Sequence, residues 1–99
     1  MSIASDETEL VGQWIKRDGR VEGDATERRI GDLIAHRLQK VAISPTSGAW
    51  EVLYLDPGDG RYWELSYPHS GWHGGGPKRL AAISASLARE KYQLAAGPS

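Results

Sequence analysis

Residues 56–77 read DPGDGRYWELSYPHSGWHGGGP, in which one alternating run, Tyr62–Tyr67, stands between two glycine-rich segments. The stretch contains two tryptophans, two tyrosines, two histidines and six glycines. Glycine weakens regular structure and is favoured where the backbone turns sharply or approaches another group closely. The stretch therefore predicts a strand flanked by unusual loops, and loops on a rigid scaffold often carry function.

The residues before this stretch predict the partner strand of a hairpin. Ala49–Leu55 alternates in the manner of a strand, and Pro57 and Gly60 favour a turn between it and the run described above. A register that sets Leu53 opposite Glu64, with a bulge at the turn, keeps like charges apart and gathers the large apolar side chains on one face. That face consists of Trp50, Val52, Tyr54, Trp63, Leu65 and Tyr67. The opposite face consists of Glu51, Leu53, Leu55, Tyr62, Glu64 and Ser66.

A second hairpin is predicted near the start of the chain. Leu10–Lys16 and Arg20–Glu22 flank Asp18 and Gly19, a pair that accepts the positive φ angles of a type I′ turn. We expect the first strand of this hairpin to bury Trp14.

One main helix is predicted over Ala25–Gln39. Asp24 stands three residues before Glu27, the spacing of a capping box, in which each side chain satisfies the free backbone amide of the other residue. Four apolar residues fall on one face of this helix, at Ile30, Leu33, Ile34 and Leu38. Four charged residues face away from it, at Arg28, Arg29, Asp32 and Arg37. This spacing is typical of a surface helix with one buried stripe.

Shorter elements complete the pattern. Val41–Ser44 fits a short strand, Pro45–Gly48 fits a turn, and Lys78–Ile83 fits a further strand. Ser84 is placed to cap a last helix, which carries Leu87, Ala88 and Tyr92. These elements predict an α+β fold, with a small antiparallel sheet of about four to six strands packed by one main helix, and with a short C-terminal helix.

Length and composition predict one soluble globular domain. The chain has 99 residues, no cysteine and a formal net charge of −1, and is too short for a second core. We expect the domain to span residues 9–92, with flexible segments at residues 1–8 and 93–99, which are small and polar. The absence of cysteine excludes a disulfide framework and thiolate chemistry.

Location and partners are also constrained by composition. No run approaches the ~20 apolar residues of a membrane span, and the start of the sequence lacks a basic leader. We therefore expect a cytoplasmic protein with no membrane contact. The near-neutral charge argues against a nucleic-acid partner, since such modules usually carry clustered lysines and arginines.

Glu51 and Glu64 lie on neighbouring predicted strands and are candidates for an acid–base couple, because paired carboxylates serve as general acid and general base. The alternative is structural, with both acids solvated or paired with Arg61 on a half-exposed face. We favour the structural interpretation because nothing in the sequence marks the pocket that catalysis requires.

His69 and His73 suggest a metal site that Glu64 or Asp59 would complete. Histidines four residues apart align as ligands on a helix, and Pro68 and Gly71 disfavour a helix here. We therefore expect no metal and no cofactor. A small metal-dependent hydrolase that uses His69 and His73 with the two glutamates remains an alternative function.

Aromatic and acidic side chains outside the predicted core indicate a protein-binding surface. Tyr62 and Trp72 are of the type that anchors an interface, and Asp56 and Asp59 would steer a partner. The other interpretation of Trp72 is packing over a sheet edge. The contact candidates are Glu51, Asp56, Asp59, Tyr62, Glu64, Trp72 and His73.

A series of short motifs stands in a characteristic order along the chain. They are ELVGQW at 9–14, DGRV at 18–21, GD at 23–24, DPGDGRYWELSYP at 56–68 and HGGGP at 73–77. This order resembles the immunity protein 27 family of bacterial polymorphic toxin systems, from about Glu9 to Tyr92. The most specific part is DPGDGRYWEL followed by HGGGP.

The resemblance implies a small cytoplasmic immunity protein that binds and neutralises a cognate toxin domain by stoichiometric occlusion. It implies no catalytic residues and specifies no oligomeric state. The contact candidates would then meet the toxin, and if that toxin is a nuclease, their acids would mimic phosphate in its basic cleft. A protein-binding adaptor with a partner other than a toxin is a further alternative, which the residues alone do not separate from immunity.

The last helix departs from the family pattern. Family members often have acidic residues directly after the capping serine, whereas Ala85, Ser86 and Leu87 follow it here. We expect a weaker cap at the start of that helix.

Overall fold

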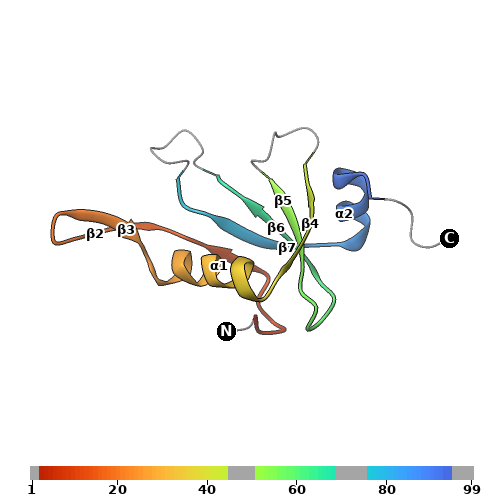
Figure 1. The fold of residues 1–99 in the computed structure, drawn as a ribbon, viewed down its shortest axis with the longest axis horizontal. Coiled ribbons are helices and arrows are strands. Elements are labelled where there is room, and N and C mark those ends of the chain that lie inside the picture. The colour runs from red at the N-terminus through yellow and green to blue at the C-terminus, as the bar shows by residue number, and fades with distance from the viewer. Residues whose placement is uncertain (1–2, 45–50, 69–75, 95–99) are drawn as a thin grey trace.

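The computed structural model describes residues 3–44, 51–68 and 76–94, which form an α+β domain. Its helices and strands are β1 (Glu9–Val11), β2 (Trp14–Arg17), β3 (Arg20–Gly23), α1 (Ala25–His36), β4 (Gln39–Ile43), β5 (Val52–Leu55), β6 (Tyr62–Ser66), β7 (Arg79–Ile83) and α2 (Ala85–Tyr92). Five strands form one antiparallel sheet in the order β1-β7-β6-β5-β4, and β2 and β3 form a separate hairpin. Figure 1 shows α1 and α2 on opposite sides of the large sheet. The predicted fold class is confirmed.

The register predicted for the central hairpin is confirmed. β5 and β6 set Leu53 opposite Glu64 and Tyr54 opposite Trp63. The predicted bulge at their turn is wrong. The strand pairing continues without a register shift to Leu55 opposite Tyr62, and the chain reverses in the turn at 57–60. A shift occurs instead between β4 and β5, at Val41 on the edge strand. The predicted turn at Pro45–Gly48 lies outside the described residues.

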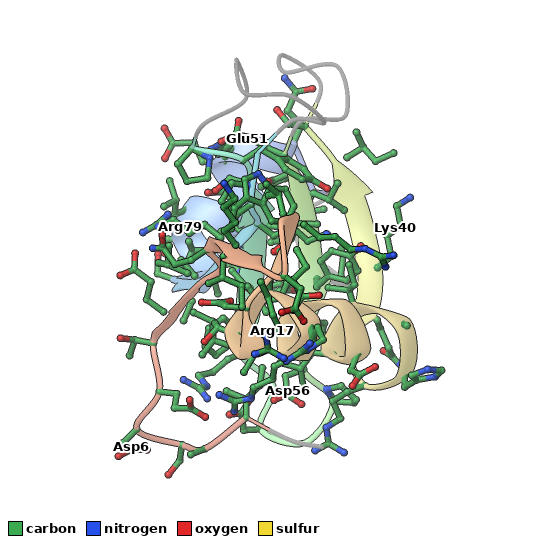
Figure 2. The ribbon with its side chains drawn as sticks, turned by 90° about the vertical axis from the view of Figure 1, so that its left-hand side faces the viewer. Asp6, Arg17, Lys40, Glu51, Asp56 and Arg79 are labelled. Carbon is green, nitrogen blue, oxygen red and sulfur yellow. The ribbon has the colours of Figure 1, made fainter. Side chains whose placement is uncertain are left out.

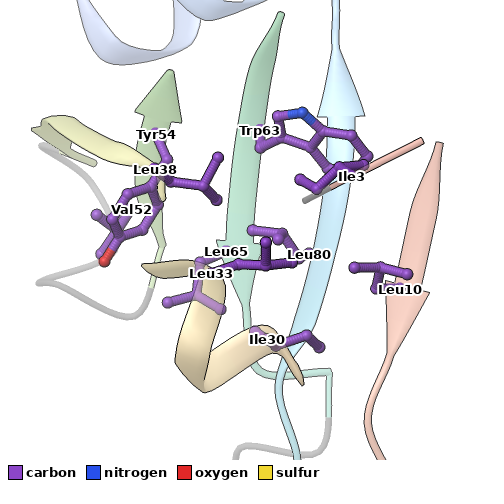
Figure 3. Packing of buried hydrophobic residues seen from close by; sticks show 10 residues of the cluster. All are labelled: Ile3, Leu10, Ile30, Leu33, Leu38, Val52, Tyr54, Trp63, Leu65 and Leu80. Atoms are coloured by element: carbon purple, nitrogen blue, oxygen red, sulfur yellow. The ribbon is translucent and has the colours of Figure 1, made fainter. Parts of the chain in front are cut away.

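The main core lies between α1 and the sheet. Trp63 is fully buried there and stands among aliphatic side chains from α1, β1, β5, β6 and β7 (Figure 3). The cluster consists of Ile3, Leu10, Ile30, Leu33, Leu38, Val52, Tyr54, Trp63, Leu65 and Leu80. It contains four of the six residues predicted for the apolar face; of the other two, Tyr67 is half-buried and Trp50 lies outside the described residues.

Helix α1 begins as predicted and ends earlier. The backbone amide of Glu27 donates to Oδ1 of Asp24 at 2.8 Å, but the reciprocal half of the capping box is absent, because the amide of Asp24 donates to the carbonyl of Gln13. The helix stops at His36 instead of Gln39. The amide of Leu38 donates to the carbonyl of Leu33, which ends the helix and turns the Leu38 side chain into the core.

The first hairpin differs from its prediction in both extent and burial. The predicted strand Leu10–Lys16 is divided near Gly12 into β1, which pairs with β7, and β2, which pairs with β3. The β2–β3 hairpin, which we call the arm (residues 14–23), projects beyond the start of α1 (Figure 1). The predicted burial of Trp14 is wrong: its exposed fraction is 37%, because the arm leaves the layer between α1 and the large sheet. The described domain is accordingly elongated, with extents of 55 × 29 × 19 Å.

The described terminal residues make contacts with the domain. Ile3, within the segment expected to be flexible, lies in the main core. Glu7 receives hydrogen bonds from both terminal nitrogens of Arg29, at 2.7 and 2.6 Å. At the other end, Leu94 packs beside α2. Ser84 caps α2 through the amide of Leu87 at 3.1 Å, so the helix begins at Ala85 without acidic residues in its first turn.

Candidate functional site

The face of the sheet beneath α2 brings together three of the predicted contact candidates. Tyr62 and Glu64 point to this face from β6, and Glu51 directly precedes β5. A small apolar cluster supports the face, made of Leu53, Ala88 and Tyr92, with Ala42, Tyr62, Ile83 and Leu94 at its margin. The parity of β5 and β6 predicted this grouping, whereas the position of α2 above it comes only from the structure.

A charged cluster lies at the edge of this apolar patch. Nζ of Lys91 donates to Oε2 of Glu51 at 2.8 Å and lies 2.7 Å from Oε2 of Glu64. The hydroxyl of Tyr92 donates to the same Glu64 oxygen at 2.8 Å. We call these four residues the acid–lysine cluster. Glu64 is buried, and its carboxylate is paired with Lys91 at a place that water reaches poorly.

The cluster changes the titration of its two α2 members. Burial raises the pKa of Tyr92, and the hydrogen bond to Glu64 raises it further, so its hydroxyl stays protonated and donates. Burial by itself would lower the pKa of Lys91, but the bonds to Glu51 and Glu64 outweigh that effect and raise it. A protonated lysine between two carboxylates is an arrangement that holds α2 on the sheet.

The β5–β6 turn holds two more candidates at the other end of the domain. Glu51 and Asp56 lie towards opposite ends of the molecule (Figure 2). Asp56 is buried, and its Oδ1 accepts from the amide of Gly58 at 2.8 Å and lies 3.5 Å from Nε of Arg37. The structure thus uses this carboxylate to shape the turn and to tie it to the end of α1.

Asp59 occupies the exposed part of the same turn. Its carboxylate accepts from the backbone amide of Arg61 at 3.0 Å and from Nε of Arg61 at 2.6 Å. These two bonds, with the backbone bond the larger cause, lower the pKa of Asp59. Arg61 also stands 4.8 Å above the ring of Trp63 and donates to the carbonyl of Glu7 at 2.6 Å. The option of pairing Arg61 with Glu51 or Glu64 is therefore wrong, because Arg61 lies over Trp63 on the α1 face of the sheet, whereas Glu64 faces α2.

The remaining candidates, Trp72 and His73, lie outside the described residues, as does His69. Within residues 3–44, 51–68 and 76–94, no three His, Asp or Glu side chains are grouped so that they could hold a metal ion. Glu51 and Glu64 share Lys91 between them and face α2. This geometry favours the structural interpretation of the two acids.

Two features escaped the sequence analysis. Lys91 has no motif of its own, and its role follows only from the docking of α2 beside β5 and β6. Glu27 is the other: it is buried, and its carboxylate accepts from the amide of Lys78 at 3.0 Å and from Nζ of Lys78 at 3.1 Å. The position of Glu27 three residues after Asp24 indicated a role in the helix cap. No local pattern indicated that its partner is Lys78, 51 residues away.

Comparison with known protein families gives a match to this chain. A family model described as immunity protein 27 matches residues 16–84, which is more than half of the chain and extends from β2 to the N-cap of α2. No curated protein and no solved structure matches. Among the described residues, neither helix is both long and apolar enough to cross a membrane.

Proposed function

Because the chain belongs to the immunity protein 27 family, we propose that it binds and neutralises a cognate bacterial toxin domain by stoichiometric occlusion. The single observation that carries this proposal is the family match over residues 16–84. The toxin would belong to a polymorphic toxin system used in competition between bacteria, and the protein would act in the cytoplasm of the cell that makes it. Inhibition requires binding alone, with no turnover by this chain.

The geometry of the charged groups supports a binding role. The acid–lysine cluster uses its carboxylates for internal contacts, and Glu27 is likewise bound to Lys78. An acid that must accept or release a proton during catalysis needs access to a substrate, and Glu27 and Glu64 are buried and engaged in these contacts. A scaffold cross-linked in this way is rigid, and rigidity lowers the ordering cost of association.

The contact candidates contribute unequally to this proposal. Asp59 lies on an exposed turn, and Tyr62 and Glu51 are half-buried at the margin of the α2 face. Asp56 and Glu64 are buried, so we expect them to act by holding the turn and α2 in place. Trp72 and His73 stay in the proposal as contacts from the glycine-rich segment.

A protein interface of ordinary size can provide the affinity that protection from a toxin requires. An interface of about 1,600 Å² with a few aromatic anchors reaches nanomolar dissociation constants or better. Replacing Trp72 with Ala is expected to weaken toxin binding by about 2 kcal/mol or more if the side chain is an anchor. A fall in melting temperature with unchanged affinity would instead assign Trp72 to packing.

The proposal is tested with the toxin domain encoded next to this gene. Purified chain is titrated into the active toxin domain, and toxin activity and complex mass are measured together. We expect activity to disappear at a ratio of about one to one, as occlusion by a single bound copy requires. A non-cognate toxin domain serves as the control. A tight complex that leaves toxin activity intact would contradict occlusion.

A further inference from the structure

The arm is preformed and stands apart from the large sheet. Asp18 and Gly19 have φ angles of 52° and 78°, the combination of a type I′ turn, whose twist matches that of the two strands. At the base of the arm, the amide of Gly12 donates to the carbonyl of Lys78 at 2.8 Å. The amide of Asp24 donates to the carbonyl of Gln13 at 2.9 Å. An isolated two-stranded hairpin is marginally stable, so this anchoring is what keeps the arm ordered.

One face of the arm carries two solvent-exposed apolar side chains beside a lysine. Register places Trp14 opposite Gly23 and Lys16 opposite Val21, so these four residues share a face. Val21 has an exposed fraction of 69%, the highest of the large hydrophobic residues in the described chain, and Trp14 is 37% exposed. Tryptophan is among the residues that most often dominate binding energy at protein interfaces, and Val21 adds exposed apolar area beside it.

The tip of the arm is positively charged, unlike the rest of the protein. Residues 16–20 contain three cations and one anion, which leaves nine cations and twelve anions for the remaining chain. Within the described part of the chain, Lys16 and Arg20 take part in no ion pair, and Arg17 meets Glu22 only at 3.5 Å with both side chains exposed. Figure 2, which views the molecule from the side of the arm, shows Arg17 towards the viewer. The free charge on the arm is thus cationic, whereas several acids of the large sheet are already paired.

We propose that the arm is the principal toxin-docking element, and that it inserts into an apolar groove bordered by carboxylates on the toxin domain. The inference rests on the proposed function and names the surface and the partner chemistry for it. Lys16 and Arg20 would meet the carboxylates, and Val21 and Trp14 would fill the groove. Because the arm is already ordered, it docks with little further loss of backbone entropy. In this arrangement the protein contributes positive charges to the interface, whereas phosphate mimicry would use the negative charges of the β5–β6 hairpin.

The test compares variants of the arm with variants of the body, each titrated against the toxin domain encoded next to this gene. The first arm variant is Val21→Asp, and the second is the pair Lys16→Glu and Arg20→Glu. All three side chains are exposed, so folding is retained. We expect each variant to raise the dissociation constant by about tenfold or more. The effect of the charge reversal should shrink as salt is raised.

Matched body variants supply the controls. Leu87→Asp changes an exposed apolar side chain on α2, and the pair Lys40→Glu and Arg89→Glu reverses two exposed charges away from the arm. We expect these to change the dissociation constant by less than about threefold, as peripheral substitutions do. Circular dichroism and melting temperature verify that every variant is folded.

The outcomes separate the inference from the proposed function. Loss of toxin binding in the arm variants alone supports the arm as the docking element. Unchanged binding in the arm variants, with full inhibition by the wild-type chain, overturns the arm and leaves the proposed function intact. Equal losses in arm and body charge variants also overturn it, because they indicate unspecific steering. An arm variant that only dissociates a dimer of this chain reassigns the arm to self-association. A wild-type chain that does not bind the toxin domain contradicts the proposed function itself.

Discussion

The β2–β3 and β5–β6 hairpins share a simple form and have different surroundings. Each joins two short strands through a turn rich in Asp and Gly, and each carries a tryptophan. Trp63 of β6 is fully buried between α1 and its own sheet, whereas Trp14 of β2 is 37% exposed. The β5–β6 hairpin is central in the sheet and has a helix on each side, while β2 and β3 pair only with each other. A hairpin pattern therefore predicts pairing, and a neighbouring layer decides whether its aromatic residue becomes core or surface.

The two hairpins also differ in how their charges are used. Asp56, Asp59 and Glu64 of the central hairpin all have partners within the domain. Lys16 and Arg20 of the arm have no such ion pairs among the described residues. A charge that is already paired within the domain adds little to the affinity for a new partner, because its existing contact must be broken or desolvated. The comparison therefore separates a hairpin that builds the fold from one that is free to bind.

The largest expected difference between the hairpins is in their tryptophans. Trp63→Ala removes a fully buried indole and should lower the free energy of unfolding by about 3–5 kcal/mol, which is severe for a domain of this size. Trp14→Ala should cost about 1 kcal/mol, because much of that side chain already contacts water. Denaturant unfolding of both variants measures the contrast. Similar losses at the two positions would mean that the arm is part of the core.

A smaller effect is expected where the arm joins the body. A Cβ added to Gly23 would lie 2.6 Å from Cγ and 3.0 Å from Cβ of Glu27, atoms near the helix backbone that have little room to move. Gly23→Ala should therefore destabilise the domain by about 1–3 kcal/mol through overpacking. Gly31→Ala is the matched control, since a Cβ there meets nothing within 4 Å, and it should stabilise α1 by about 0.5–1 kcal/mol. Thermal unfolding of the two variants should shift in opposite directions.

The far face of the central hairpin gives the next effect. Tyr92→Phe removes the donor to the buried carboxylate of Glu64, which keeps its contact with Lys91. We expect a loss of about 1–2 kcal/mol in the free energy of unfolding, as for a hydrogen bond to a charged group. Toxin affinity should stay unchanged if the arm is the docking element. A loss of affinity without a loss of stability would place the contact beneath α2.

The smallest effect concerns the contact that ties residues 3–8 to the domain. Arg29 binds Glu7, and these hydrogen bonds lower the pKa of the Glu7 carboxyl from 4.5 to about 2. A carboxyl whose pKa is lower in the folded than in the unfolded state stabilises the fold above the unfolded value. That contribution, about 1 kcal/mol for a partly exposed pair, is lost as the pH falls from about 4.5 towards about 2.

Glu7→Gln should therefore flatten the stability profile in this acid range. Urea unfolding at pH values from about 2 to about 7, where carboxyl groups titrate, gives the slope of the unfolding free energy against pH for both proteins. Asp6→Asn, at an exposed neighbour, is the control. An identical slope in wild type and Glu7→Gln would show that the pair contributes nothing to folding.

Local patterns predicted much of the central fold because their physics is local. The parity of β5 and β6 gave the pairing of Leu53 with Glu64, and the spacing of Ile30 and Leu33 gave the buried stripe of α1. Ser84 was predicted as a cap from its side chain alone, and it caps α2. Side-chain alternation, helical periodicity and capping each depend on residues within one or two turns of each other.

The candidate site was predicted less completely. The grouping of Glu51, Tyr62 and Glu64 followed from parity, but the two acids were expected to be solvated or paired with Arg61, and they pair with Lys91. Arg61 has the right charge and is near in sequence, whereas Lys91 reaches the acids because α2 folds back over the sheet. Nothing within the hairpin specifies where that helix docks.

The sequence by itself determined the α+β class, the register of the central hairpin, the start of both helices and the family of the protein. Only the tertiary structure decided that β1 leaves the arm to pair with β7, that Trp14 stays exposed, and that the acids of the β5–β6 hairpin are used internally. The physical reason is that burial and ion pairing depend on which surfaces meet across long loops. A chain of alternating residues has two faces, and only its neighbours in space determine which of them water can reach.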